Sequence, residues 1–184
     1  MRRVLIYLAA MVLTISVVGS AGARQGDEQL DGLFARLKAT ADSQEAAVIQ
    51  ARIWEVWFES GAADIDRLLA AGNVAMNGRN FEAALARFDA VIARDPELAE
   101  GWNWRATLYY LMGEFEASIT DIQHTLALEP RHFGALSGLG LVNIRLGRLR
   151  EAIAAFEAAL AVNPHMESAR QNIREINKVL GEDI

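Results

Sequence analysis

Small and large apolar residues recur with a fixed period of 34 residues between positions 65 and 166. One set of equivalent positions holds Phe88, Ile122 and Phe156. The only three prolines follow the same period, at Pro96, Pro130 and Pro164. A glycine near the middle of each period marks a turn: Gly78, Gly113 and Gly147. The pattern predicts three helix–turn–helix units over residues 65–98, 99–132 and 133–166.

Two further sets of equivalent positions hold small residues. They are Gly72, Ala106 and Gly140 in the first helices, and Ala84, Ser118 and Ala152 in the second helices. Antiparallel helices approach closely only where side chains are small, so we expect the two helices of each unit to touch at these positions. A single unit cannot bury its apolar face, so its stability has to come from stacking on its neighbours.

This arrangement resembles the tetratricopeptide repeat (TPR) family, whose unit is a helix–turn–helix of this length. Residues 133–166 carry the resemblance most clearly, with Leu136, Gly140, Ala152, Phe156, Ala159 and Pro164 at family positions. It implies an all-α fold, a TPR helical solenoid of three repeats. Arg105 departs from the pattern, because the family has an apolar residue there. We expect its charge to reach solvent or to pair with a carboxylate such as Glu114.

In this family the first helices of successive repeats line a concave groove that binds an extended or helical peptide. The resemblance places eleven residues of this chain on that groove: Leu69, Asn73, Met76, Asn103, Trp104, Thr107, Tyr110, Ser137, Leu141, Ile144 and Arg145. One subgroup clamps a peptide's terminal carboxylate, but only Asn73 fits that clamp here. Leu69, Trp104, Gly134 and Gly138 stand at its other positions, so we do not expect recognition of Hsp90 or Hsp70 tails. Gly138 either admits a ligand backbone or is a tolerated imperfection of its helix.

The segments on either side of the repeats read as helices. Residues 167–184 have one polar, solvent-facing side and one apolar side, and we expect them to form a capping helix. Residues 24–64 read as two helices separated near residues 40–42, and we expect a degenerate repeat-like hairpin that caps the first repeat. In the alternative, Trp54, Trp57 and Phe58 are exposed and this hairpin self-associates.

Residues 1–23 have the three-part layout of a secretory signal peptide. Arg2 and Arg3 precede an uncharged, mostly apolar run, and small residues follow it at positions 20–23. We expect cleavage after Ala23 and an exported, periplasmic protein. The alternative is an uncleaved N-terminal membrane anchor that leaves the protein facing the periplasm.

Composition excludes several functions. The 184-residue chain has a net charge of −6, which argues against a nucleic-acid binder. It has no cysteine and three histidines, none in a zinc-binding spacing, so no metal site is predicted. Fingerprints of nucleotide cofactors and of catalytic serines are missing, so we expect no cofactor and no enzyme.

Two functions fit these observations. The first is a monomeric, non-catalytic interaction module that binds a peptide or helix of another exported or envelope protein in its groove. The second is a structural subunit of an envelope complex that associates with itself through the N-terminal hairpin.

Overall fold

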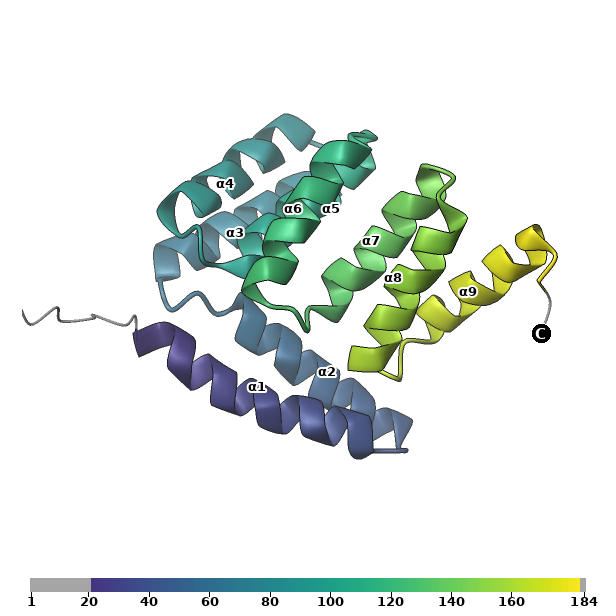
Figure 1. Ribbon diagram of the computed structural model, residues 1–184. Coiled ribbons are helices and arrows are strands. Elements are labelled where there is room, and N and C mark those ends of the chain that lie inside the picture. The colour runs from purple at the N-terminus through teal and green to yellow at the C-terminus, as the bar shows by residue number, and fades with distance from the viewer. Residues whose placement is uncertain (1–20, 183–184) are drawn as a thin grey trace, which may run out of the picture.

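The computed structural model describes residues 21–182, with the backbone alone described over residues 21–28. This part of the chain is all-α and has no strand (Figure 1). Its helices are α1 (Ala21–Ala39), α2 (Ser43–Phe58), α3 (Ala63–Asn77), α4 (Phe81–Arg94), α5 (Ala99–Met112), α6 (Phe115–Leu128), α7 (Phe133–Arg145), α8 (Leu149–Val162) and α9 (Glu167–Leu180).

The predicted all-α solenoid is confirmed. Each 34-residue stretch forms one antiparallel pair, α3–α4, α5–α6 or α7–α8, and the pairs stack side by side in chain order (Figure 1). The α9 helix packs on α8 and continues the stack. It buries Ala169 and Ile176, while most of its charged residues stay exposed.

The small residues let the paired helices touch, as predicted. A methyl group on Gly72 would lie 2.5 Å from the ring of Phe88, and one on Gly140 would lie 2.6 Å from the ring of Phe156. In the middle repeat the Ser118 hydroxyl donates a hydrogen bond of 2.8 Å to the carbonyl of Ala106. Close contact in this pair therefore adds a buried hydrogen bond to the apolar packing.

The turns inside the repeats differ in which residue bends the chain. Gly113 and Gly147 take the left-handed conformation, with φ of 84° and 72°. In the first repeat Arg79 takes it instead, with φ of 58°, directly after Gly78. The predicted turn lies where the glycine marks it, but the left-handed position is one residue later.

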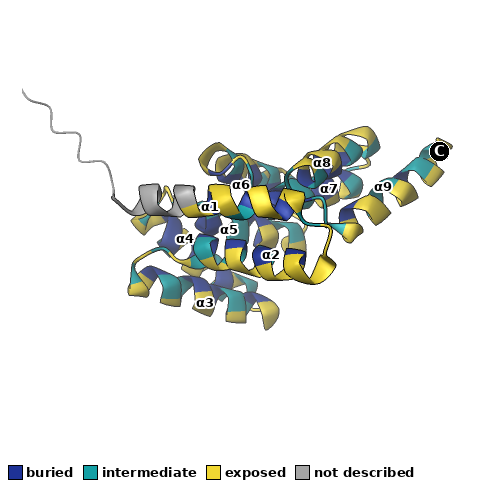
Figure 2. Ribbon diagram, turned by 90° about the horizontal axis from the view of Figure 1, so that it is seen from below, coloured by how far each residue is buried: buried dark blue, intermediate teal, exposed yellow. Residues whose placement is uncertain are grey.

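The sequence predicts a cap on the first repeat, whereas in the structure the N-terminal hairpin packs mainly on the second and third repeats. The α1 and α2 helices lie below the repeats in Figure 1, and from below they cross in front of the middle of the molecule (Figure 2). Their apolar residues share a core with Phe133 at the start of α7, and Val162 and Met166 near α8 and α9 pack against that core. Aromatic burial against the second and third repeats outweighs the weak repeat-like register.

Several polar contacts hold the hairpin to the connections between repeats. The Asn163 amide donates to Gln50 Oε1 at 3.1 Å, and the His165 ring Nε2 lies 3.0 Å from the Leu37 carbonyl oxygen. Arg131 forms an ion pair with Asp31. Arg131 lies next to Pro130, and Asn163 and His165 lie on either side of Pro164. The connections between repeats therefore form part of the surface on which the hairpin docks.

The expected leader over residues 1–23 lies outside the described residues except for its last three. Among the helices of residues 21–182, none is long and apolar enough to cross a membrane.

Candidate functional site

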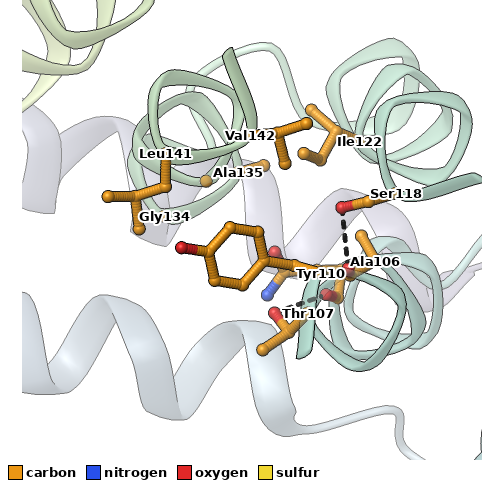
Figure 3. A pocket seen from close by; sticks show the side chains of 11 residues that line it. Ala106, Thr107, Tyr110, Ser118, Ile122, Gly134, Ala135, Leu141 and Val142 are labelled. Carbon is orange, nitrogen blue, oxygen red and sulfur yellow. Dashed lines mark hydrogen bonds between the residues drawn. The ribbon is translucent and has the colours of Figure 1, made fainter. Parts of the chain in front are cut away.

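A cleft of about 80 Å³ separates the first helices of the second and third repeats, α5 and α7 (Figure 3). We call it the α5–α7 cleft. A water molecule needs about 10–15 Å³ of such space, so the cleft has room for several waters or one small aliphatic side chain. It is lined by Asn103, Ala106, Thr107, Tyr110, Ser118, Ile122, Gly134, Ala135, Gly138, Leu141 and Val142.

The α5 wall is polar at one end and aromatic at the other. Asn103 donates to Glu100 Oε2 at 3.0 Å, and the Thr107 hydroxyl donates to the Asn103 carbonyl at 3.0 Å. The half-buried ring of Tyr110 extends across the cleft toward α7 (Figure 3). This wall offers an amide oxygen, a hydroxyl and an aromatic face to a ligand.

The α7 wall is apolar and opens at Gly138. Leu141 borders the cleft and keeps 36% of its surface exposed. The nearest atom to a methyl group on Gly138 would be Ile122 Cδ1, at 3.7 Å. That is ordinary van der Waals contact, so packing does not require a glycine here. Its missing side chain instead leaves space in the cleft.

The predicted groove residues separate into three groups. Asn103, Thr107, Tyr110 and Leu141 meet in the α5–α7 cleft. Leu69 and Met76 are 4% and 5% exposed in the core of the first repeat, so they offer little surface to a ligand. The rest lie elsewhere: Asn73 hydrogen-bonds Asn77, Trp104 borders the first-repeat core, Ile144 packs toward α8 and α9, and Ser137 and Arg145 lie on α7 outside the cleft lining.

The chain's own α2 helix covers part of the predicted groove, which the sequence did not indicate. Phe58 packs against Trp104, with ring centroids 5.7 Å apart. A methyl group on Gly134 would lie 2.6 Å from the Trp54 ring. Two of the positions that differ from a carboxylate clamp are thus occupied by intramolecular aromatic contacts.

A second, more open cleft of about 440 Å³ lies between the end of α2 and α3. Leu69 and Asn73 border it together with Phe58 and three acidic residues. One of these, Asp66, accepts hydrogen bonds from the hydroxyl and the backbone N–H of Ser60 at 2.5 and 3.1 Å. These bonds fix the connection between α2 and α3, so this carboxylate already has a structural role.

His132 is buried between the hairpin and the repeats. Its Nδ1 accepts the backbone N–H of Ala135 at 3.0 Å, so Nδ1 carries no proton, and Nε2 lies 3.2 Å from Glu100 Oε1. The ring stacks on Trp57 with centroids 4.2 Å apart. Both His132 and Glu100 are at most 1% exposed. A histidine with both nitrogens engaged and no solvent access anchors structure and does not transfer protons to a ligand.

Arg105 pairs with other carboxylates than the expected Glu114. It donates to both Asp121 oxygens at 2.7 and 2.9 Å and to Asp89 at 2.6 Å. These hydrogen bonds, those to Asp121 first, hold the pKa of Arg105 above its usual value. The guanidinium therefore ties α5 to α6 and α4, and its role is structural.

Among the side chains that the structure describes, those of residues 29–182, no three from His, Asp or Glu are placed to hold a metal ion. The polar groups of the α5–α7 cleft are amides and hydroxyls, without a titratable base beside a nucleophile. The arrangement suits binding by shape and hydrogen bonds.

The chain belongs to the tetratricopeptide repeat family, whose sequence profile matches residues 69–123 and 105–167. A TPR repeat-containing protein of Rhizobium etli is 37% identical over 153 residues, which cover 83% of this chain and 75% of that protein. Small glutamine-rich tetratricopeptide repeat-containing protein 2 of Mycosarcoma maydis is 26% identical over 111 residues, 60% of this chain and 32% of that protein. The chain thus spans three quarters of the first relative and about a third of the second.

Solved structures share the fold. The first TPR of Spaghetti (RPAP3), bound to the HSP90 peptide SRMEEVD, has a TM-score of 0.61 at 23% identity, over 64% of this chain and 93% of that one. MamA has a TM-score of 0.61 at 21% identity, over 90% of this chain and 88% of that one. Members of this family are typically interaction modules without catalytic activity, and a role in protein–protein interaction fits the chain.

Proposed function

We propose that this protein is a non-catalytic adaptor that binds an extended segment of another exported or envelope protein in the α5–α7 cleft. The observation that carries the proposal is the cleft itself. It is open and narrow, with an apolar wall on α7 and hydrogen-bonding groups on α5. Extended segments bind in this way, with one apolar side chain anchored and the backbone hydrogen-bonded.

An extended segment suits the space better than a helix does. A helix with its side chains is about 10–12 Å across, whereas the cleft holds about 80 Å³. The α2 helix already packs on Gly134 and Trp104 at one end of the cleft. Of the two ligand classes that the family resemblance implies, an extended peptide or a helix, the extended peptide therefore fits this cleft better.

The proposed export of the protein rests on the sequence of residues 1–23, which has a basic start, an apolar run and small residues after it. Export would bring the cleft to partners in the envelope. An uncleaved leader would give the same partners and add a membrane anchor.

Photo-cross-linking in intact cells tests the function. A benzoylphenylalanine replaces Leu141 at the cleft, and a matched control replaces Val48, which is 70% exposed on α2. We expect a discrete protein adduct from position 141 that is absent from position 48. Adding Gly138→Leu, which fills the cleft, should abolish it. An adduct that survives Gly138→Leu, or equal labelling from both positions, would overturn the proposal.

A further inference from the structure

We infer that Arg145 makes the α5–α7 cleft selective for a peptide with an acidic residue two positions from its aliphatic anchor. This inference rests on the proposed function and adds the chemistry of the partner. Arg145 is the only cationic residue among those predicted to line the groove. It lies four residues after Leu141, and therefore about one turn further along the same face of α7.

Aromatic rings hold the Arg145 side chain next to the cleft. Its guanidinium lies 5.7 Å from the centroid of the Tyr110 ring and 5.0 Å from that of Phe115. Tyr110 is also the residue that crosses the cleft (Figure 3). Stacking on aromatic faces restricts a guanidinium without using its N–H donors, so these stay available to a carboxylate.

Arg145 has no ion-pair partner within the described part of the chain, unlike most of the arginines there. Arg148, which precedes the first residue of α8, pairs with Glu116. Arg105 and Arg131 each bind two carboxylates. Arg145 remains exposed next to the apolar α7 wall of the cleft. An acidic group on the partner would complete this site, since charge-assisted bonds to a guanidinium are stronger than neutral ones.

The spacing of the site fixes the spacing of the motif. Four residues of helix rise about 6 Å, the distance along α7 from Leu141 to Arg145. In an extended peptide, side chains on the same face are two residues apart and separated by about 6.6 Å. If the aliphatic side chain of the peptide lies beside Leu141, the side chain two residues away therefore lies opposite Arg145. A carboxylate at that position can pair with the guanidinium.

Selection from a phage-displayed library of random linear peptides tests this inference on the full chain. We expect enrichment of peptides with Asp or Glu two positions from Val, Leu or Ile. Measured by fluorescence anisotropy, Arg145→Gln should weaken the selected peptides about fivefold. Arg145→Glu should enrich Lys or Arg at that position. Arg87→Glu makes the same charge change at an exposed site on α4 and should leave binding unchanged.

The outcomes separate this inference from the proposed function. Selected peptides that lack an acidic preference, or that bind Arg145→Glu as tightly as the native protein, overturn the role of Arg145 and leave cleft binding intact. If the native protein enriches no peptide, or if Gly138→Leu enriches the same peptides, cleft binding itself is overturned.

Discussion

Arg105 shows how one partly buried charge connects three helices. Its guanidinium binds Asp121 on α6, which is 3% exposed, and Asp89 on α4. It also lies 5.1 Å from the centroid of the Trp102 ring. The family pattern has an apolar residue at this position. In this chain the carboxylate of Asp121 on the neighbouring helix compensates for the charge of Arg105. Removing one member of the pair is therefore expected to destabilise the protein more than replacing both.

Removing one member of this pair should destabilise the protein strongly. We expect Arg105→Leu to lower the free energy of unfolding by about 3 kcal/mol, because it leaves the Asp121 carboxylate buried without a partner. Replacing both Arg105 and Asp121 by leucine should recover most of the loss. Urea denaturation measures these changes. Asp89→Asn is the control, and since Asp89 is 51% exposed its effect should stay under about 1 kcal/mol. A double variant no more stable than Arg105→Leu would contradict this account.

Two glycines of α7 should respond oppositely to the same substitution. Gly134→Ala places a methyl group 2.6 Å from the Trp54 ring, and Trp57 and Phe133 pack against that ring. The substitution should therefore lower the free energy of unfolding by about 1–3 kcal/mol. Gly138→Ala meets nothing closer than 3.7 Å and should stabilise the helix by up to about 1 kcal/mol. Thermal unfolding of the two variants checks this. Equal shifts of the melting temperature in the same direction would show that α2 is not in close contact with Gly134.

At the scale of the elements, the N-terminal hairpin is the part that departs from the repeat pattern. Its aromatic residues pack on the start of α7, and Trp57 also stacks on the buried His132. Glu100, which contacts His132, also accepts a hydrogen bond from Asn103 in the α5–α7 cleft. The docked hairpin therefore supports one wall of the candidate binding site.

Truncating the central aromatic residue of this interface should loosen the hairpin. Trp57 is 7% exposed, and Trp57→Ala should lower the free energy of unfolding by about 3–5 kcal/mol. The matched control is Val48→Ala, on the same helix but 70% exposed, with an expected effect within about 0.5 kcal/mol. Limited proteolysis gives a second measurement, because an undocked hairpin exposes the connection at residues 59–62. Unchanged stability of Trp57→Ala would refute the docking role.

For the whole molecule, we predict a monomer from the way the hairpin aromatics are packed. The three aromatic residues that could have made a self-association surface contact the repeats of their own chain: Trp54, Trp57 and Phe58. The connection to α3 is short and held by Ser60 and Asp66, which keeps the hairpin on its own repeats. The apolar area available for a dimer through this hairpin is correspondingly reduced.

Light scattering coupled to size-exclusion chromatography checks the oligomeric state of the full chain. We expect the mass of one chain at all concentrations up to about 100 µM, the range in which weak dimers with micromolar dissociation constants would form. A dimer that Trp57→Ala disrupts would instead support the self-associating subunit considered from the sequence.

The sequence by itself determined the repeat stack. The 34-residue period, the small residues at Gly72 and Gly140, and the prolines specify helices, turns and the contact within each pair. All of these are local, because each repeat touches only its neighbours along the chain. Part of the candidate site followed as well, since Asn103, Thr107, Tyr110 and Leu141 are the cleft residues that the repeat register placed on the groove.

Only the tertiary structure decided where the hairpin lies and which part of the groove stays open. Those outcomes depend on contacts between residues far apart in the chain, such as Asn163 with Gln50 and His165 with Leu37, which are separated by 113 and 128 positions. No periodic pattern encodes such pairs. They are selected when aromatic side chains find the surface that buries most of their area, and that surface exists only once the repeats have stacked.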